Sequence, residues 1–159
     1  MVLEVGINSY LTVEEADILV SNNLDDDSED SLEWNKLSTD SKEKLLIKGT
    51  RLVDKLPYLG IKYNPSSKLS WPRIINLNKK ECPDDVKLGL ICQMLKGRRN
   101  SSKQELKLQE LGVKDYKIKN ASITFADKNN TKVDCGIYKS IFDEYFIKYI
   151  YWKFMKGGT

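Results

Sequence analysis

The chain contains no histidine among its 159 residues. Histidine is the commonest general base near neutral pH, the usual partner of serine and cysteine nucleophiles, and a usual ligand of catalytic zinc. Glycine is sparse too, and the nine glycines never form the close cluster of a phosphate-binding loop. These absences predict a protein that is not an enzyme and that binds no cofactor and no metal.

Cysteine and long apolar runs are also scarce. Cys82, Cys92 and Cys135 are an odd number at wide, unpatterned spacings, which argues against a disulfide framework and a metal knuckle. We expect them to be small buried apolar residues. The first residues show no basic stretch followed by an apolar one, and no apolar run could cross a bilayer. We therefore expect a soluble intracellular protein with no membrane contact.

Charge is unevenly distributed behind the net value of +3. The first 40 residues contain eleven acidic residues and one basic residue, whereas the remainder contains 25 basic and 12 acidic residues. Opposite charges at the two ends of one chain can steer copies of that chain together. The alternative interpretation is a solvated acidic loop, since the acidic run lacks the ligand spacing of a calcium loop.

Hydrophobic periodicity predicts a mainly α fold, a small helical bundle of about four to five helices in a single domain over residues 1–159. Thr12 and Glu15 form a capping-box pattern that begins the first helix. Asn22-Asn23 ends it, and an acidic loop is expected over residues 22–33.

Two further helices follow from their start and stop signals. Ser38 or Asp40 caps the second, which Pro57 stops. Pro83 suits the first turn of the third, whose apolar stripe ends at Gly97 and which we expect to be the central helix.

The remaining segments differ in period. Residues 57–82 carry Pro, Gly, Asn and Ser at short intervals, which predicts a long ordered loop, and loops of this length are commonly functional or docked. Alternation over residues 113–127 predicts one β-hairpin. A C-terminal helix is expected over residues 136–154, with an apolar face that either meets a neighbouring chain or is buried in the core.

A basic cluster raises the question of nucleic-acid binding. Lys96, Arg98, Arg99, Lys103 and Lys107 lie close together in the sequence. Single strands are bound by basic grooves with exposed aromatic platforms. Most aromatic residues of this chain instead follow the apolar face of the last helix, so a DNA contact at Arg98 and Arg99 is the secondary interpretation.

Several sequence blocks together resemble one bacteriophage family. They are Asn8-Ser9-Tyr10, Thr12 to Asp17, Trp34, Lys42 to Ile47, Thr50 to Asp54, Leu69-Ser70-Trp71-Pro72-Arg73, Cys82 to Lys87 and Gly112-Val113-Lys114. The Trp-Pro-Arg block and the Cys-Pro start of the following helix are the most distinctive. The chain is similar to the small phage proteins labelled DnaT-like, which resemble helical head–tail connectors in fold.

The resemblance implies a virion structural protein that acts in viral assembly. Such a head-completion or head–tail connector (adaptor) protein forms an oligomeric ring, typically of twelve copies, and its partners are the portal protein and the neck or tail-terminator protein. Genomic DNA would pass through without specific binding. The protein would lie in the host cytoplasm and then at the head–tail junction of the virion. The alternative is a single-stranded DNA-binding accessory protein, as the DnaT-like label implies.

Predicted assembly contacts fall in the long loop, the hairpin and the last helix. They are Trp71, Pro72 and Arg73, then Ile118, Ile123 and Phe125, then Tyr145, Tyr149, Trp152 and Phe154. Two alternatives stay open: Trp71 as a core plug that anchors the loop, and Arg73 as a clamp on nearby carbonyl groups.

Overall fold

The structure is a computed structural model that describes residues 2–101, 115–118, 121–124 and 136–150. Helices dominate this part of the chain, which confirms the mainly α fold. They are α1 (Val13–Asn23), α2 (Glu29–Asn35), α3 (Thr39–Val53), α4 (Asp84–Ser101), α6 (Lys139–Ile141), the π-helical segment η1 (Phe142–Phe146) and the 3₁₀ segment η2 (Ile147–Tyr149). The strands are β1 (Ile61–Lys62), β2 (Arg73–Ile75), β3 (Asn78–Lys80), β4 (Asp115–Ile118) and β5 (Ala121–Thr124).

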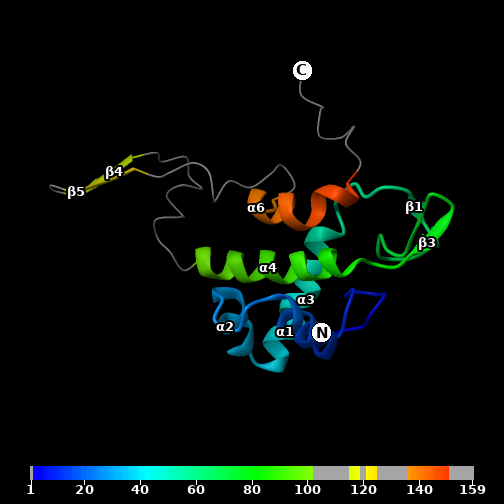
Figure 1. The fold of residues 1–159 in the computed structure, drawn as a ribbon, viewed down its shortest axis with the longest axis horizontal. Helices are drawn as coiled ribbons and strands as arrows, with labels where there is room; N and C mark the ends of the chain where they lie inside the picture. Colours follow the sequence, from blue (N-terminus) through cyan, green and yellow to red (C-terminus); the bar gives the residue numbers. More distant parts are fainter. Residues whose placement is uncertain (1, 102–114, 119–120, 125–135, 151–159) are drawn as a thin grey trace, which may run out of the picture.

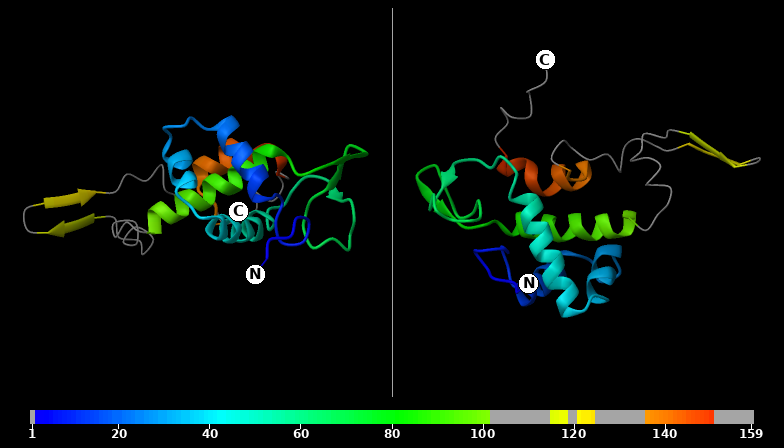
Figure 2. Two further views of the ribbon diagram at one scale, coloured as in Figure 1. Left: turned by 90° about the horizontal axis from the view of Figure 1, so that it is seen from below. Right: turned by 180° about the vertical axis from the view of Figure 1, so that it is seen from behind.

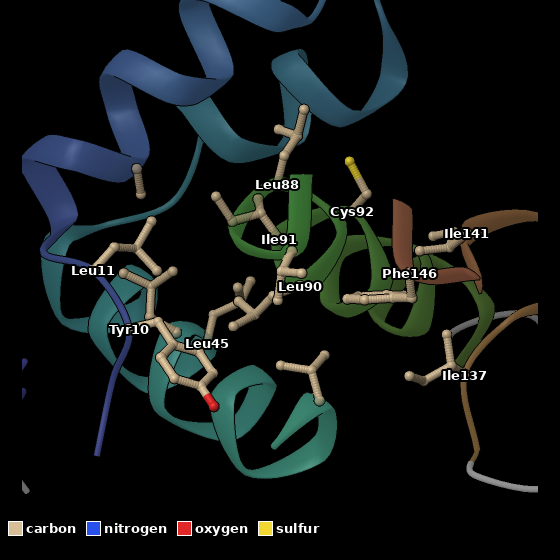
Figure 3. Close-up of a cluster of buried hydrophobic side chains, with 14 of the residues drawn as sticks. Tyr10, Leu11, Leu45, Leu88, Leu90, Ile91, Cys92, Ile137, Ile141 and Phe146 are labelled. Atoms are coloured by element: carbon tan, nitrogen blue, oxygen red, sulfur yellow. The ribbon is translucent and has the colours of Figure 1, made fainter. Parts of the chain in front are cut away.

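Helix α4 is the centre of the bundle, as expected. It contacts α1, α2 and α3, and it also contacts α6 and η1 (Figure 1). Figure 2 shows α3 crossing α4 at a steep angle. Because neighbours pack on it from several directions, α4 buries residues around most of its circumference, among them Val86, Leu90, Ile91 and Leu95. Side chains from α1, α3, α4 and the η1 region meet in one hydrophobic core (Figure 3).

The helix starts confirm the capping signals. The Thr12 Oγ1 accepts a hydrogen bond from the Glu15 amide at 3.1 Å, and Glu15 Oε2 accepts one from the Thr12 amide at 2.8 Å. Ser38, one of the two predicted caps of α3, accepts from the Ser41 amide. Each cap satisfies an amide that the helix itself leaves without a partner.

The segment predicted as an acidic loop over residues 22–33 overlaps the end of α1 and most of helix α2, which continues to Asn35. Ser28 caps it, and the acidic residues in its first turn favour the positive end of the helix. Trp34 fixes α2 to the bundle, because its side chain is fully buried and its Nε1 donates to Asp17 Oδ1 at 2.7 Å. The acidic composition predicted a loop, but the Ser28 cap and the buried Trp34 specify a short helix there.

Helix α4 continues past the predicted end at Gly97 to Ser101. A glycine inside a helix costs only about 1 kcal/mol relative to alanine. The last turn carries Arg98 and Arg99, which reach acidic residues of α2, so these contacts offset that cost.

The predicted loop over residues 57–82 is ordered and contains a small antiparallel sheet in the order β1-β2-β3. Lys62 pairs with Arg73 and Arg73 with Lys80, while Ile61 pairs with Ile74 and Ile74 with Lys79. These strands have only two or three residues, too few for alternation to be recognised in the sequence.

The predicted hairpin is formed by β4 and β5, with Ile118 opposite Ala121 and Tyr116 opposite Ile123. The predicted C-terminal helix over residues 136–154 is instead a series of short segments up to Tyr149, and Ile150 is extended. The chain leaves the helix there because it pairs with the segment before β1: the Leu59 amide donates to the Tyr149 carbonyl at 2.8 Å. None of the described helices has the length and apolar character to span a membrane.

Candidate nucleic-acid interface

Trp71 holds the segment before β2 in the core. It is 3% exposed, and its ring makes edge-to-face contacts with Tyr58, at 5.3 Å between centroids, and with Tyr149, at 6.3 Å. Edge-to-face aromatic contacts stabilise beyond their buried area. Trp71 is therefore placed as a core plug, the alternative that its sequence context left open.

Arg73 ties β2 to the chain that leads into β1. Its Nε donates to the Leu59 carbonyl at 2.7 Å, and its Nη2 donates to the carbonyls of Tyr58 at 3.1 Å and Gly60 at 2.6 Å. Its Nη1 donates to the Ser70 carbonyl at 3.2 Å. The guanidinium thus clamps carbonyl groups, as the second alternative expected, and it fixes the geometry of the sheet.

Gly60 allows β1 to approach β2. Its φ is +76°, and a Cβ at this position would lie 2.1 Å from the Ile74 carbonyl oxygen. No side chain fits such a contact, and positive φ favours glycine. The close contact between β1 and β2 therefore requires glycine at position 60.

Asp54, directly after α3, joins the sheet segment to the N-terminal residues. Its Oδ1 accepts from the Ser70 amide at 2.7 Å and from the Tyr10 hydroxyl. The Ser70 hydroxyl donates to the Asp54 carbonyl at 2.9 Å. Burial raises the pKa of Tyr10, and the hydrogen bond to Asp54 raises it further. The base of the sheet is thus held by buried polar contacts.

The outer face of the sheet, defined by Ile61, Tyr63, Ile74 and Lys79, combines aromatic, aliphatic and basic side chains. Tyr63 continues β1, since its amide donates to the Pro72 carbonyl at 3.0 Å, and alternation along the strand places it on the face of Ile61. Ile61 is 67% exposed and Tyr63 is 52% exposed. The Lys79 Nζ lies 4.8 Å from the centre of the Tyr63 ring. This face offers an aromatic surface to solvent beside a cation.

Basic residues dominate the chain around this sheet. Between residues 55 and 80 the sequence has six basic residues and no acidic residue. Three of them, Lys62, Arg73 and Lys80, lie directly opposite one another across the three strands. Like charges opposite one another in a sheet are mutually destabilising. Lys62 Nζ donates to the Ser67 carbonyl at 3.0 Å and Arg73 donates to backbone carbonyls, so this row, on the face opposite Tyr63, adds positive charge to the sheet while two of its members are held by the chain.

Arg98 and Arg99 are engaged within the molecule. Arg99 Nη1 lies 2.6 Å from Asp30 Oδ1 and 3.0 Å from Glu33 Oε2, and Arg98 Nε lies 3.3 Å from Glu33 Oε1. Burial lowers the pKa of Arg99, but the pairing with the two carboxylates raises it more, so the net shift is upward. The acidic N-terminal quarter thus neutralises basic residues of its own chain.

Tyr145 and Tyr149, the described residues among those predicted in the last helix, face inward. Tyr145 is partly buried and packs against α4 at Gly89, where an added Cβ would lie 2.6 Å from the Tyr145 Cβ. Tyr149 contacts Trp71 and donates from its hydroxyl to Asp85 Oδ2 at 2.9 Å. Both tyrosines therefore hold the helices together.

The other predicted contact residues divide into two groups. Pro72 is partly buried beside Trp71, and Ile118 and Ile123 lie on the paired strands of the hairpin. Phe125, Trp152 and Phe154 lie outside the described residues.

Sequence reasoning missed Tyr63, Lys79 and Lys80 as candidate binding residues. The signal that could have found them is the stretch over residues 55–80, which has six basic residues and no acidic residue. In the part of the chain that the structure describes, no group of three or more acidic or cysteine side chains could hold a metal ion.

Comparison with known families places the chain in one of them. The model of a family described as "Putative DnaT-like ssDNA binding protein" matches residues 2–148. No curated protein and no solved structure matches the chain significantly.

This family match corrects the functional prediction. It supports single-stranded DNA binding and gives no support to a head-completion or head–tail connector protein, so that prediction is wrong. The predicted partners are corrected for the same reason: the ring of copies, the portal, the neck or tail-terminator protein, and DNA that passes without being bound. The predicted role as a virion structural protein is wrong for the same reason.

Proposed function

This chain belongs to the DnaT-like family of ssDNA-binding proteins, and we propose that it binds single-stranded DNA on the outer face of its β1–β2–β3 sheet. The family match over residues 2–148 is the observation that carries the proposal. The exposed aromatic and basic side chains of the sheet support its location.

Tyr63 provides the stacking surface. An unstacked base has a π face that an aromatic ring can cover, and each such contact contributes about 1–3 kcal/mol in single-strand-binding proteins. About half of the Tyr63 side chain is open to solvent, and Ile61 beside it is more exposed still. A base stacked on Tyr63 would therefore also cover apolar surface that is now in contact with water.

Lys79 provides a phosphate contact next to the stacked base. Its ammonium lies over the Tyr63 ring and pairs with Glu81 at 2.6 Å, with side chains that are 46% and 71% exposed. Exposed pairs of this kind contribute little. The ammonium can therefore exchange the carboxylate for a phosphate at small cost.

The row formed by Lys62, Arg73 and Lys80 lies on the opposite face of the sheet from Tyr63 and adds long-range attraction only. These residues belong to the stretch over residues 55–80, where the sequence places no acidic residue among them. Arg98 and Arg99, in contrast, already have carboxylate partners. The sheet is thus the better site for a phosphate backbone.

Fluorescence anisotropy with labelled oligo(dT) of about 20 nucleotides tests the proposal. The affinity should fall with salt, with a slope of about −0.7 for each phosphate contact. Tyr63→Ala should weaken binding by roughly 5- to 150-fold, the equivalent of 1–3 kcal/mol. Tyr63→Phe keeps the ring and should bind like the wild type.

A charge variant with a matched control tests the location. Lys79→Ala should reduce the salt slope by about 0.7. Lys44→Ala removes the same charge from an exposed pair on α3 and should leave the slope unchanged. Equal effects of these two variants would place the DNA elsewhere, and no binding by the wild type at low salt would refute the proposed function.

A further inference from the structure

The turn between β2 and β3 carries an exposed leucine in an unfavourable backbone conformation. Asn76 and Leu77 connect the strands with φ of 51° and 64°. Two-residue hairpin turns with both φ values positive strongly prefer Asn-Gly, because glycine has no Cβ penalty there. Asn76 fits this preference, whereas Leu77 occupies the position of the glycine.

Leu77 is also almost fully solvated. Its side chain is 97% exposed, the highest value among the exposed large hydrophobic residues of the described chain. It therefore gains nothing from burial within this molecule that would offset its backbone strain. Residues held in strained conformations concentrate at functional sites, where a contact outside the folded chain accounts for them.

The surroundings of Leu77 indicate what that contact is. Lys79 and Lys80 follow it on β3, where all three residues are exposed, and Tyr63 lies beneath the Lys79 ammonium. The nearest acidic residue after the turn is Glu81, and none precedes it back to Asp54. An apolar tip with cations directly behind it is complementary to stacked bases bordered by phosphates.

We infer that Leu77 is an apolar wedge that packs against the last base pair where a duplex opens into a single strand. This inference rests on the proposed function, since the outer face of the sheet would hold the emerging strand. Proteins that part base steps commonly insert an aliphatic or aromatic side chain between them. Leucine has no ring to stack on an isolated base, so its contact is favourable where paired bases present a continuous apolar surface.

The test compares Leu77→Gly with Leu77→Met on three DNA probes: oligo(dT), a blunt duplex, and a duplex with a single-stranded dT tail. The wild type and Leu77→Met should prefer the tailed duplex to oligo(dT) by roughly tenfold. Leu77→Gly should lose this preference and bind oligo(dT) within about twofold of the wild type, because the outer face is unchanged. Its melting temperature should rise, because Asn-Gly relieves the turn.

A base analogue whose fluorescence reports unstacking, placed in the last base pair, gives a second readout. Contact with Leu77 should change the emission of this base when wild-type protein binds, and Leu77→Gly should leave it unchanged. Equal affinity of the wild type for tailed duplex and oligo(dT) would overturn the wedge and leave single-strand binding intact. Failure of the wild type to bind any probe would overturn both. Binding of the wild type, but not of Leu77→Gly, to anionic lipid vesicles without a junction preference would assign Leu77 to a membrane contact and overturn the wedge.

Discussion

Replacing Arg99 with alanine should destabilise the protein far more than the same change at Arg98. Arg99 makes two close contacts with Asp30 and Glu33, and all three side chains are largely shielded, with exposures of 26%, 23% and 21%. Arg98 makes one contact of 3.3 Å and is 54% exposed. Because the two arginines are adjacent and share Glu33, each is a matched control for the other.

The expected magnitude follows from these geometries. A hydrogen bond to a charged group contributes about 1.5–3 kcal/mol net when it is shielded, whereas an exposed ion pair contributes about 0–1 kcal/mol. With roughly a quarter of its side chain in solvent, Arg99 should contribute about 2 kcal/mol to the free energy of unfolding, and Arg98 less than about 0.5 kcal/mol. For a chain of this length, 2 kcal/mol corresponds to a fall in melting temperature of about 4–8 °C.

Thermal and urea unfolding of the two variants provide the measurement. The Arg99→Ala difference should largely persist at 1 M salt, because shielded pairs are screened less than exposed ones. Both variants should bind oligo(dT) like the wild type. The reasoning would be refuted by equal destabilisation from the two changes. A loss of DNA affinity in either variant would return the DNA contact to the end of α4.

Three further results are expected. Gly60→Ala should lower the free energy of unfolding by about 2 kcal/mol or more, because it adds a positive-φ penalty to a backbone clash. Gly97→Ala should raise the free energy of unfolding by about 0.5–1 kcal/mol, because an added Cβ there meets nothing within 4 Å. Urea unfolding of the two variants measures both changes. Lys148 and Tyr149 lower the pKa of Asp85, so its contribution to stability should be present above the unfolded pKa near 4 and should disappear as the pH falls through the lower folded value. Asp85→Asn should therefore lower the free energy of unfolding by less than about 1 kcal/mol at neutral pH. At the acid end of a pH series, the variant and the wild type should be equally stable. Burial raises the pKa of Cys92 to about 12, so this thiol should not react with a disulfide reagent at pH 8 until the protein unfolds. Cys82 is only partly buried, although its pKa is raised as well, so it should react slowly in the native state; rapid native-state labelling of Cys92 would contradict its burial.

Helix positions could be predicted from the sequence where a cap and a periodic apolar face coincide. The Thr12–Glu15 box and the Ser38 cap both form as expected. Helix α2 could not be recognised in the same way, because a run of acidic residues obscures a short helix whose stability comes from the buried Trp34. The Ser28 cap and Trp34 are visible in the local sequence. The partner that holds Trp34, Asp17 of α1, is distant in the sequence and cannot be recognised from it.

The candidate site was less predictable than the helices. The conspicuous residues Trp71 and Arg73 could be identified from the sequence, but their roles could not, because both depend on groups brought together by folding: aromatic rings for Trp71 and carbonyls for Arg73. Tyr63 and Lys79 meet only through the pairing of β1 with β2 and of β2 with β3. Strands this short have no sequence period that would reveal that pairing.

The two basic regions of the chain lie at opposite ends of α4 (Figure 1), and their neighbours decide which of them can hold a polyanion. At the C-terminal end, α2 brings Asp30 and Glu33 onto Arg99, so phosphate would have to displace shielded carboxylates that already satisfy the guanidinium. At the N-terminal end, the outer face of the sheet places the Lys79 ammonium over the exposed Tyr63 ring, and the carboxylate that pairs with it, Glu81, is itself 71% exposed. The acidic start of the sequence therefore acts within the molecule: it neutralises the basic residues at one end of α4 and leaves the sheet as the proposed site for single-stranded DNA.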